Sequence, residues 1–252
     1  MWGRRAVAAH AAGSSRPLRP GQARPLGGSL MVRSMTAPSV PRATREQHLA
    51  RILFLLDRAG EDPGEHSPEG AYSLMHGQTR LQALDFWVRN PDYLADELLN
   101  EYEAGRMGDE AIETAKKIFA TREPQIRRLP MTKWRFGAYE RLDDTLSLLA
   151  CSGLLVHRPH AGPESVREHL YWLMDEGHEF ADALLAADPV FHWYADRAEL
   201  VAALAGSAGG AALKGRQYKQ VEYATTASNT LISSIEPRVR SRLDESEGTV
   251  AA

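Results

Sequence analysis

The sequence has few of the residues that carry catalytic or redox chemistry. Cys151 is the single cysteine among 252 residues, so an intrachain disulfide and a cysteine-cluster metal site are excluded, and a reducing, cytoplasmic location is expected. The thiol lies in an apolar stretch, which favours a small core residue over a nucleophile. No uncharged apolar run approaches the roughly 18 residues of a membrane-spanning helix. We therefore expect a soluble globular protein without a membrane partner.

Motifs of common enzyme and cofactor sites are also missing. The sequence has no Gly-x-Ser-x-Gly, His-Glu-x-x-His or Gly-x-Gly-x-x-Gly, and GSAGG (206–210) lacks the Gly-Lys-Ser/Thr of a phosphate-binding loop. His178, Glu179 and Asp182 share one face of a predicted helix, but acidic residues near a helix start are favoured by the helix dipole alone. The histidines at positions 157, 160, 169, 178 and 192 show no metal-ligand spacing. We expect no catalytic residue, no metal and no cofactor.

Acidic residues are absent from the first 45 positions, which hold eight arginines among many Ala, Gly, Pro and Ser residues. Without apolar periodicity, residues 1–43 cannot bury enough surface to offset their conformational entropy and are predicted to be disordered. Met31 and Met35 are alternative starts, and we prefer an over-extended reading frame to a transit peptide or a nucleic-acid-binding arm. The other 22 basic residues stand against 33 acidic ones, a balance near −11.

Helical periodicity dominates the next part, residues 44–104. Thr44 and Gln47 form a Thr-x-x-Gln capping box before an apolar run, and Pro91 follows Asn90 as the first residue of another helix. Cap and breaker residues limit the predicted helices to about 44–60, 69–89, 91–104 and 109–121. These are expected to be packing helices of a mainly α protein.

After Pro130 the pattern alternates between short strands and helices. Gly137 is predicted as a turn, and the helix that follows it should bury Leu142, Leu146 and Leu149. The predicted strands are 133–136, 154–158 and 169–173, with a loop at 159–168. The predicted helices are 139–152 and about 175–186, the second with Phe180, Leu184 and Leu185 inward.

This order of elements resembles winged helix-turn-helix proteins. The stretches TLSLLACSGLLVHR (145–158) and HLYWLMDEGHEFADALL (169–185) carry the resemblance, which covers about residues 105–187. It implies a winged-helix unit with a small β-hairpin wing inside a mainly α protein. Two features depart from the family: the gap before Tyr139 exceeds the usual short turn, and Met174 stands where a capping Thr is usual.

The resemblance makes residues 139–152 the recognition helix, which would enter the major groove of DNA. Three of its five outward residues are acidic, and acids facing a polyanion weaken binding that depends on Lys and Arg. The outward residues are Glu140, Arg141, Asp143, Asp144 and Ser147. The helix is therefore expected to read DNA poorly.

Basic residues on either side of this helix are candidate contacts to phosphates or to an acidic partner. They are Arg127, Arg128, Lys133, Arg135, Arg141, Arg158 and Arg167. We give DNA about the same weight as a solvated basic face or one that meets an acidic partner. The balance near −11 then counts against DNA, because dedicated DNA-binding domains have a pI above ~9.

A looser resemblance concerns RLQALDFWVRNPDYLADELL (80–99) and the Arg-Phe-Gly-x-Tyr stretch at 135–139. These are similar to middle components of bacterial ABC-three-component conflict systems. The resemblance implies a non-catalytic subunit or adaptor that bridges an ATPase and an effector protein. The alternative is a winged-helix transcriptional regulator that binds DNA, and a homo-oligomer is open in either case.

The C-terminal part is predicted to be helical, with a helix over 189–204 and a flexible link at 206–210. A later apolar stripe is expected to pack on the core rather than on a second copy of the chain; it consists of Val221, Ala224, Leu231, Ile235, Val239 and Leu243. The predicted organisation is 1–43 disordered, 44–104 helical, 105–187 winged helix, 188–245 helical and 246–252 tail.

Overall fold

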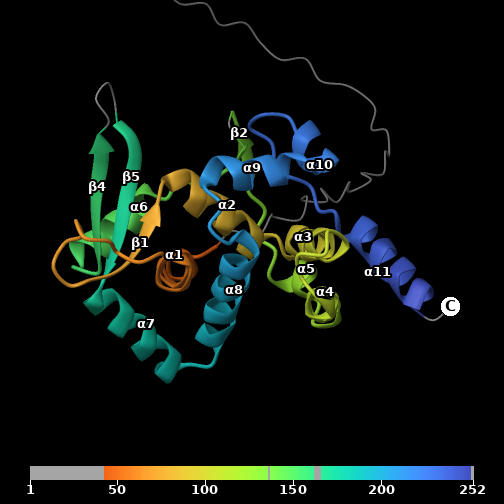
Figure 1. Ribbon diagram of the computed structural model, residues 1–252, viewed down its shortest axis with the longest axis horizontal. Coiled ribbons are helices and arrows are strands. Elements are labelled where there is room, and N and C mark those ends of the chain that lie inside the picture. The colour runs from red at the N-terminus through yellow and green to blue at the C-terminus, as the bar shows by residue number, and fades with distance from the viewer. Residues whose placement is uncertain (1–42, 136, 162–165, 251–252) are drawn as a thin grey trace, which may run out of the picture. The chain divides into compact units, whose positions relative to one another are not determined.

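The computed structural model describes residues 43–135, 137–161 and 166–250, so the segment predicted to be disordered lies, apart from Ala43, outside the described residues. Most described residues are helical, which confirms the mainly α class (Figure 1). The helices are α1 (Arg45–Ala59), α2 (Gln78–Arg89), α3 (Pro91–Glu103), α4 (Asp109–Ala120), α5 (Glu123–Ile126), α6 (Asp143–Cys151), α7 (Asp175–Ala187), α8 (Val190–Ala205), α9 (Gly210–Tyr218), α10 (Val221–Thr225) and α11 (Glu236–Val250). The strands are β1 (Ala71–His76), β2 (Thr132–Trp134), β3 (Gly137–Tyr139), β4 (Leu155–Ala161) and β5 (Val166–Met174). In this part of the chain no helix has both the length and the apolar composition to cross a bilayer.

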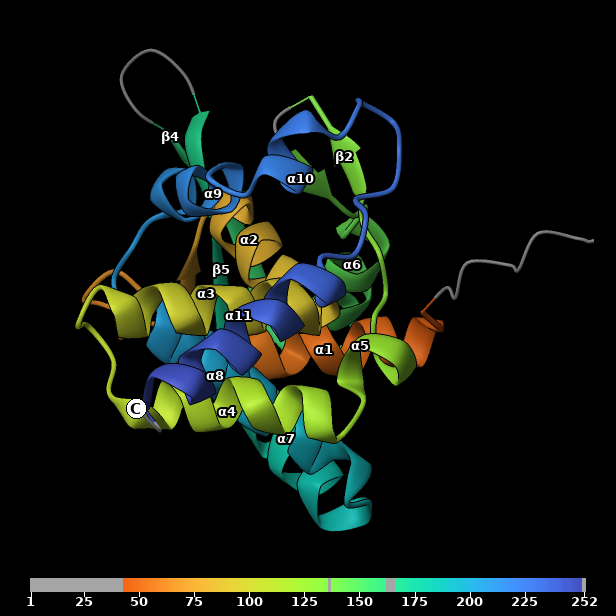
Figure 2. The same ribbon diagram turned by 90° about the vertical axis from the view of Figure 1, so that its right-hand side faces the viewer.

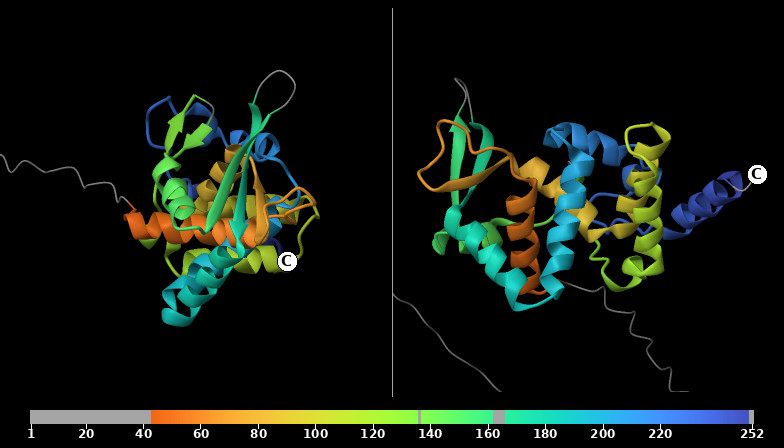
Figure 3. Two further views of the ribbon diagram at one scale, coloured as in Figure 1. Left: turned by 90° about the vertical axis from the view of Figure 1, so that its left-hand side faces the viewer. Right: turned by 60° about the horizontal axis from the view of Figure 1, so that its bottom comes forward.

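Helix α1 lies in the centre of the hydrophobic core. Its start has the predicted capping box: the Thr44 hydroxyl accepts from the Gln47 amide at 3.3 Å, and the Gln47 side chain accepts from the Thr44 amide at 2.9 Å. Every residue from Ala50 to Asp57 is buried, so the helix is covered on all sides rather than along one stripe. Helix α8 runs beside α1 (Figure 3), and α2, α6 and α7 also pack against it.

Residues 69–89, predicted as one helix, form strand β1, a glycine turn and helix α2. Gly77 has φ +76°, a conformation that favours glycine, and it separates the two elements. β1 pairs with β5, with Leu74 opposite Trp172. The apolar residues of β1 fit a helical and a strand pattern equally. The segment forms a strand because it pairs with a strand that is distant in the sequence. The single-helix prediction is wrong for the first half of this segment.

The larger sheet has the strand order β1-β5-β4, and both neighbouring pairs are antiparallel. β4 and β5 form the predicted hairpin, but their ladder extends further than expected. Pro159 pairs with His169 and His160 pairs with Glu168, although residues 159–168 were predicted as a loop. β4 lies at the edge of the sheet, where a proline without an N–H group is tolerated. The sheet joins a strand from the predicted 44–104 part to two strands from the predicted 105–187 unit.

Helix α7 differs from its predicted packing. Gly177 and Ala181 are its buried residues, whereas Phe180 was expected to point inward and is exposed. Leu184 and Leu185 are half-buried against the core. A Cβ on Gly177 would lie 2.6 Å from the carbonyl oxygen of Leu154, so α7 approaches the start of β4 too closely for a larger residue on that face.

The C-terminal helix α11 packs against α3 and α4, as Figure 2 shows. Ile235, Val239 and Leu243 of the predicted apolar stripe are buried, which confirms intramolecular packing for this half of the stripe. Val221 and Leu231 are exposed, so the first half does not form one buried face. The chain between them bends back toward the smaller sheet, where Leu231 forms a bridge with Thr132.

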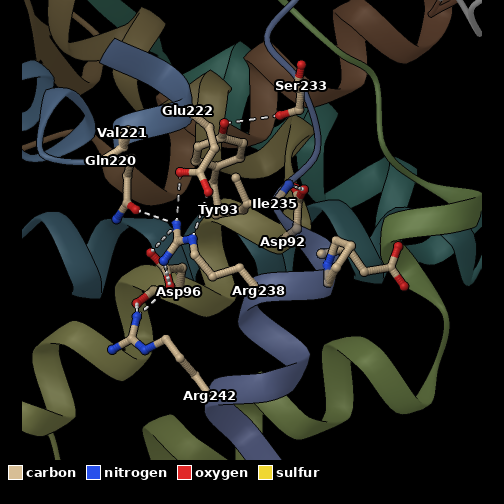
Figure 4. Close-up of polar contacts among 12 residues, drawn as sticks. Asp92, Tyr93, Asp96, Gln220, Val221, Glu222, Ser233, Ile235, Arg238 and Arg242 are labelled. Carbon is tan, nitrogen blue, oxygen red and sulfur yellow. Dashed lines mark hydrogen bonds and ion pairs between the residues drawn. The ribbon is translucent and has the colours of Figure 1, made fainter. Parts of the chain in front are cut away.

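Ion pairs fix α11 on α3 (Figure 4). Arg238 contacts the Asp96 carboxylate at 3.0 Å and the Glu222 carboxylate at 2.9 Å. Arg242 contacts Asp96 as well, so two guanidinium groups neutralise one buried carboxylate. Asp92, one turn earlier, accepts from the backbone amide of Ile235 at 2.8 Å. These contacts supply the partners that buried acidic groups require.

Candidate functional site

The basic residues expected at a partner surface differ in their placement, and Lys133 lies in the interior. Its side chain is 7% exposed, and Nζ donates to the carbonyl oxygens of Tyr223 at 2.9 Å and Ala224 at 2.7 Å. The ammonium group also lies 5.2 Å from the centre of the Tyr218 ring. Lys133 therefore ties β2 to α10, which corrects the expectation that it contacts a phosphate or an acidic partner.

Arg127 and Arg128 also contribute to the fold. The Arg127 guanidinium lies 4.3 Å from the centre of the Trp193 ring, a cation–π contact with α8. Arg128 donates to the carbonyl oxygen of Ile232 at 2.6 Å and lies 3.8 Å from the buried Asp92 carboxylate. Both side chains are half-buried, and their charged groups face other parts of the same chain.

The other basic candidates lie nearer to solvent. The Arg141 side chain is 74% exposed and lies 3.7 Å from the Asp143 carboxylate. Arg158 is exposed on β4, with its guanidinium 5.9 Å from the centre of the Trp172 ring. Arg135 is exposed between β2 and β3. The Arg167 side chain lies outside the described residues.

Helix α6 begins at Asp143 rather than at the predicted Tyr139. The preceding backbone is held by Gln82, whose amide donates to the Glu140 carbonyl at 2.5 Å and accepts from the Glu140 N–H at 2.9 Å. The Glu140 carboxylate pairs with Arg89 at 2.5 Å, so Glu140 does not point outward as expected. Asp143 and the neighbouring residues Asp144 and Ser147 are exposed, whereas Leu142, Leu146 and Leu149 are buried as predicted.

A hollow of about 790 Å³ lies between α1 and α6, and we call it the α6 groove. Its lining residues are Arg45, His48, Glu140, Arg141, Asp144, Thr145, Ser147, Leu148 and Cys151. Cys151 is exposed there, which corrects the predicted core position. Burial, assisted by the charges of Arg51 and Arg89, lowers the pKa of His48. The groove thus combines both charge signs with a neutral imidazole at neutral pH.

A second hollow, of about 520 Å³, lies between the β2–β3 hairpin, the start of α2 and α9, and we call it the aromatic hollow. Its lining residues are Gln78, Thr79, Gln82, Trp134, Arg135, Gly137, Tyr139, Ala211, Lys214 and Tyr218. Figures 1 and 2 show the hairpin beside α9 and α10. Three aromatic side chains, two cationic side chains and no acidic side chain belong to this set.

The hairpin register explains how the aromatic residues reach this hollow. Trp134 pairs with Gly137 and Thr132 pairs with Tyr139, so Trp134 and Tyr139 project from one face of the hairpin. Lys133 and its partner Ala138 project from the opposite face and are buried. Trp134 is 51% exposed and Tyr139 is 41% exposed. The alternation of strand side chains therefore presents aromatic rings to solvent while the lysine anchors the hairpin.

A chain of buried hydrogen bonds fixes the walls of the aromatic hollow. The Tyr223 hydroxyl accepts from the Ala138 amide at 2.6 Å, and it donates to the Gln217 side-chain oxygen at 3.4 Å. The Gln217 amide donates to the Ala83 carbonyl oxygen on α2 at 2.9 Å. Burial raises the pKa of the Tyr223 hydroxyl, so it stays protonated. The contacts connect β3, α10, α9 and α2 and hold the hollow in one shape.

Lys214 carries the positive charge on the α9 side of the aromatic hollow. It is half-buried, and this burial lowers the pKa of its ammonium group. Among the described residues it forms no ion pair, whereas Arg216 two positions later pairs with Glu97 at 2.6 Å and with Glu101 at 2.9 Å. A lysine partly removed from water without a carboxylate beside it is stabilised by any anion that enters the hollow.

The histidines serve other contacts. His178 Nδ1 lies 2.7 Å from Oδ1 of the buried Asp57, and its ring stacks on Tyr72 with the ring centres 3.7 Å apart, so it ties α7 to α1 and β1. His157 and His169 lie side by side on the β4–β5 hairpin, with a nitrogen–nitrogen distance of 2.8 Å. In the described part of the chain, no group of three or more metal-ligating side chains comes together.

Residues 133–139 are basic and aromatic in the sequence, but no local pattern there indicates Lys214 and Tyr218 as their neighbours. Both lie on α9, more than seventy residues away in sequence, and no local pattern links them to the hairpin. The available local signal is a basic stretch without acids, AALKGRQYK, which contains Lys214, Arg216 and Lys219.

Comparison of the chain with protein-family models, with curated proteins and with solved structures gives no match.

Proposed function

We propose that the protein is a non-catalytic subunit or adaptor of a bacterial multi-protein system, built on a winged-helix unit and acting through protein–protein contacts. The sheet order β1-β5-β4, with the β4–β5 hairpin as wing and α1, α2 and α6 beside the sheet, supports the winged-helix part of the proposal. In this unit α1, β1 and α2 precede α6, so the unit would begin near residue 44 rather than near 105. The segment from α3 to β3 would be a long insertion between its second and third helices.

The placement of the basic residues is the observation that carries the adaptor proposal. Three of the basic candidates use their charged groups for contacts within the same chain. Lys133 donates to carbonyl groups, Arg127 lies against an aromatic ring, and Arg128 contacts a carbonyl group and a buried carboxylate. The first turn of α6 presents Asp143 and Asp144 to solvent. Counterion release by Lys and Arg supplies most of the affinity for DNA, so the acidic first turn of α6 disfavours DNA binding. A protein partner has no such requirement.

A titration of the full chain with random duplex DNA at about 50 and 200 mM salt tests the proposal. We expect no binding at micromolar protein. Sub-micromolar binding with a steep salt dependence that weakens in Arg141→Gln and Arg158→Gln would overturn it. Coexpression with the products of neighbouring genes forms the second part of the experiment. An adaptor should form a stable complex with one of them, and the Asp144→Lys variant in the α6 groove should weaken that complex.

A winged-helix regulator is the second candidate function, because Arg141 and Arg158 are exposed close to α6 and on the proposed wing. Two exposed arginines can position a protein on phosphates without specifying sequence. The salt-dependent titration separates this candidate from the adaptor, since only the regulator needs these two charges for its affinity.

A further inference from the structure

We propose that the aromatic hollow binds a phosphorylated nucleoside, with the base against the rings of Trp134, Tyr139 and Tyr218 and the phosphate at Lys214. This site goes beyond the adaptor function and does not depend on it, because the hollow lies apart from the residues that line the α6 groove. The ligand class follows from three features of the hollow: its rings, its charge and its size.

The rings supply the recognition of a flat, aromatic group. Trp134 and Tyr139 project from the same face of the hairpin, and Tyr218 joins them from α9. Tyr218 is 38% exposed, and its ring is held edge-on to the buried Tyr223 ring at 5.0 Å. Three exposed aromatic rings at one hollow indicate a binding surface rather than scattered surface residues. Stacking of bases on such rings is tolerant of the base and contributes strongly to affinity.

The charge of the hollow selects an anion over a neutral or cationic aromatic group. Lys214 is half-buried, and among the described residues no carboxylate lies beside it. The polar lining residues at the start of α2, Gln78 and Thr79, carry no charge. Gln82 is not available to a ligand, because both ends of its amide are bonded to the Glu140 backbone. A phosphate therefore meets a positive wall without a competing acid.

The size and rigidity of the hollow favour a single nucleotide over an extended peptide. Its volume of about 520 Å³ lies within the usual range for small-molecule sites. The contacts of Lys133, Tyr223 and Gln217 fix the hairpin against α9 and α2, so the rings need little reorganisation when a base binds. The nucleotide can come from two sources: a free nucleotide or one unit of a single-stranded nucleic acid.

Fluorescence titration of the full chain tests the site, with adenosine 5′-monophosphate, adenosine and a short single-stranded oligonucleotide as probes. We expect the monophosphate to bind about tenfold more tightly than adenosine, because adenosine has no phosphate to make the charge-assisted contact with Lys214. Trp134→Ala and Lys214→Gln should each weaken the monophosphate about tenfold. Tighter binding of the oligonucleotide than of the monophosphate identifies a nucleic-acid strand as the source; equal or weaker binding identifies the free nucleotide.

Matched controls separate the site from general effects on the surface. Tyr72→Leu removes an exposed aromatic ring outside the hollow, and Lys219→Gln removes an exposed lysine five residues after Lys214; both should bind like the original chain. Trp134→Phe keeps an aromatic ring at the hollow and should retain most of the affinity for the monophosphate. This variant tests the role of the ring even if Trp134→Ala does not fold normally.

Three results would overturn the proposal. The first is absence of binding by the monophosphate and the oligonucleotide at millimolar concentration. The second is binding that neither Lys214→Gln nor Trp134→Ala changes while adenosine binds equally well. The third is saturable binding of an acidic, aromatic peptide at this hollow with no nucleotide binding, which would assign the hollow to a protein partner.

Discussion

Replacement of Lys133 by methionine distinguishes two roles of this residue: the interior structural role that its contacts indicate and the surface binding role that its sequence context predicts. Methionine keeps the length and apolar character of the side chain, so the packing beside Ala138 is preserved. The change removes the ammonium group that donates to the carbonyl oxygens of Tyr223 and Ala224. Those two acceptors then lose their partner inside the fold.

The size of the effect follows from these contacts. Hydrogen bonds from a charged donor contribute about 1.5–3 kcal/mol each, and the contact with the ring of Tyr218 adds about 0.5–2 kcal/mol. The apolar methionine recovers part of this, because the cost of burying an ammonium group disappears with it. We expect the free energy of unfolding to fall by about 3 kcal/mol, which lowers Tm by roughly 6–12 °C for a domain of this size.

Urea denaturation and thermal unfolding of the full chain measure this change, with Arg141→Met as the control. Arg141 is exposed, so its replacement should alter the free energy of unfolding by less than about 0.5 kcal/mol. If Lys133→Met left stability unchanged but weakened binding to a nucleic acid or an acidic protein, the interior role derived for Lys133 would be refuted. A loss of stability without an effect on binding supports it.

Three further perturbations test other parts of the structure. Gly137 has φ +116°, and a Cβ at this position would lie 2.6 Å from the Tyr223 hydroxyl. Gly137→Ala should therefore lower the free energy of unfolding by about 1–3 kcal/mol. An unchanged midpoint of urea denaturation would contradict the rigid hairpin. The Glu123 carboxylate lies 2.6 Å from the guanidinium of the buried Arg197. Glu123→Gln leaves this buried charge unpaired and should lower the free energy of unfolding by about 3–5 kcal/mol. If the loss in the double variant Glu123→Gln/Arg197→Met equalled the sum of the two single losses, the pair would make no such contribution. Burial first, and then the neighbouring imidazole, lowers the pKa of His157 below its ordinary 6.5, so the unfolded chain binds this proton more readily. The contribution of His157 to stability is therefore fully present above pH 6.5 and is lost as the pH falls below it. When Tm is measured as a function of pH, it should decline less steeply on acidification in His157→Phe than in the original chain. Equal declines in the two proteins would refute this.

Local signals in the sequence predicted most of the helices correctly. The capping box at Thr44 and Gln47 marks the start of α1, and Pro91 is the first residue of α3. Leu146 and Leu149 of α6 point inward at the predicted spacing. In each case a cap, a breaker or a 3.6-residue period acts within a few residues, so the information is local.

Contacts between distant segments account for the errors. β1 is a strand because β5 pairs with it, and nothing within residues 69–89 indicates that partner. Lys133 looks like a surface residue beside Arg135, yet the partners that bury it are carbonyl groups of α10. Cys151 was assigned to the core from its apolar neighbours but lies on the outward side of α6. The aromatic hollow could be predicted only in part for the same reason, because its lysine comes from α9.

The pairing of α11 with α3 links the order of synthesis to the completion of the fold. Asp96 leaves the ribosome 142 residues before Arg238, an interval of roughly 7–30 s at ordinary rates of elongation. During that time the carboxylate of Asp96 has neither of its guanidinium partners and must stay hydrated, so the face of α3 that α11 later covers remains open. Native packing of this face therefore waits for the synthesis of α11 and cannot accompany the folding of α3. A chain that ends before Ile235 lacks α11 and keeps this face of α3 uncovered.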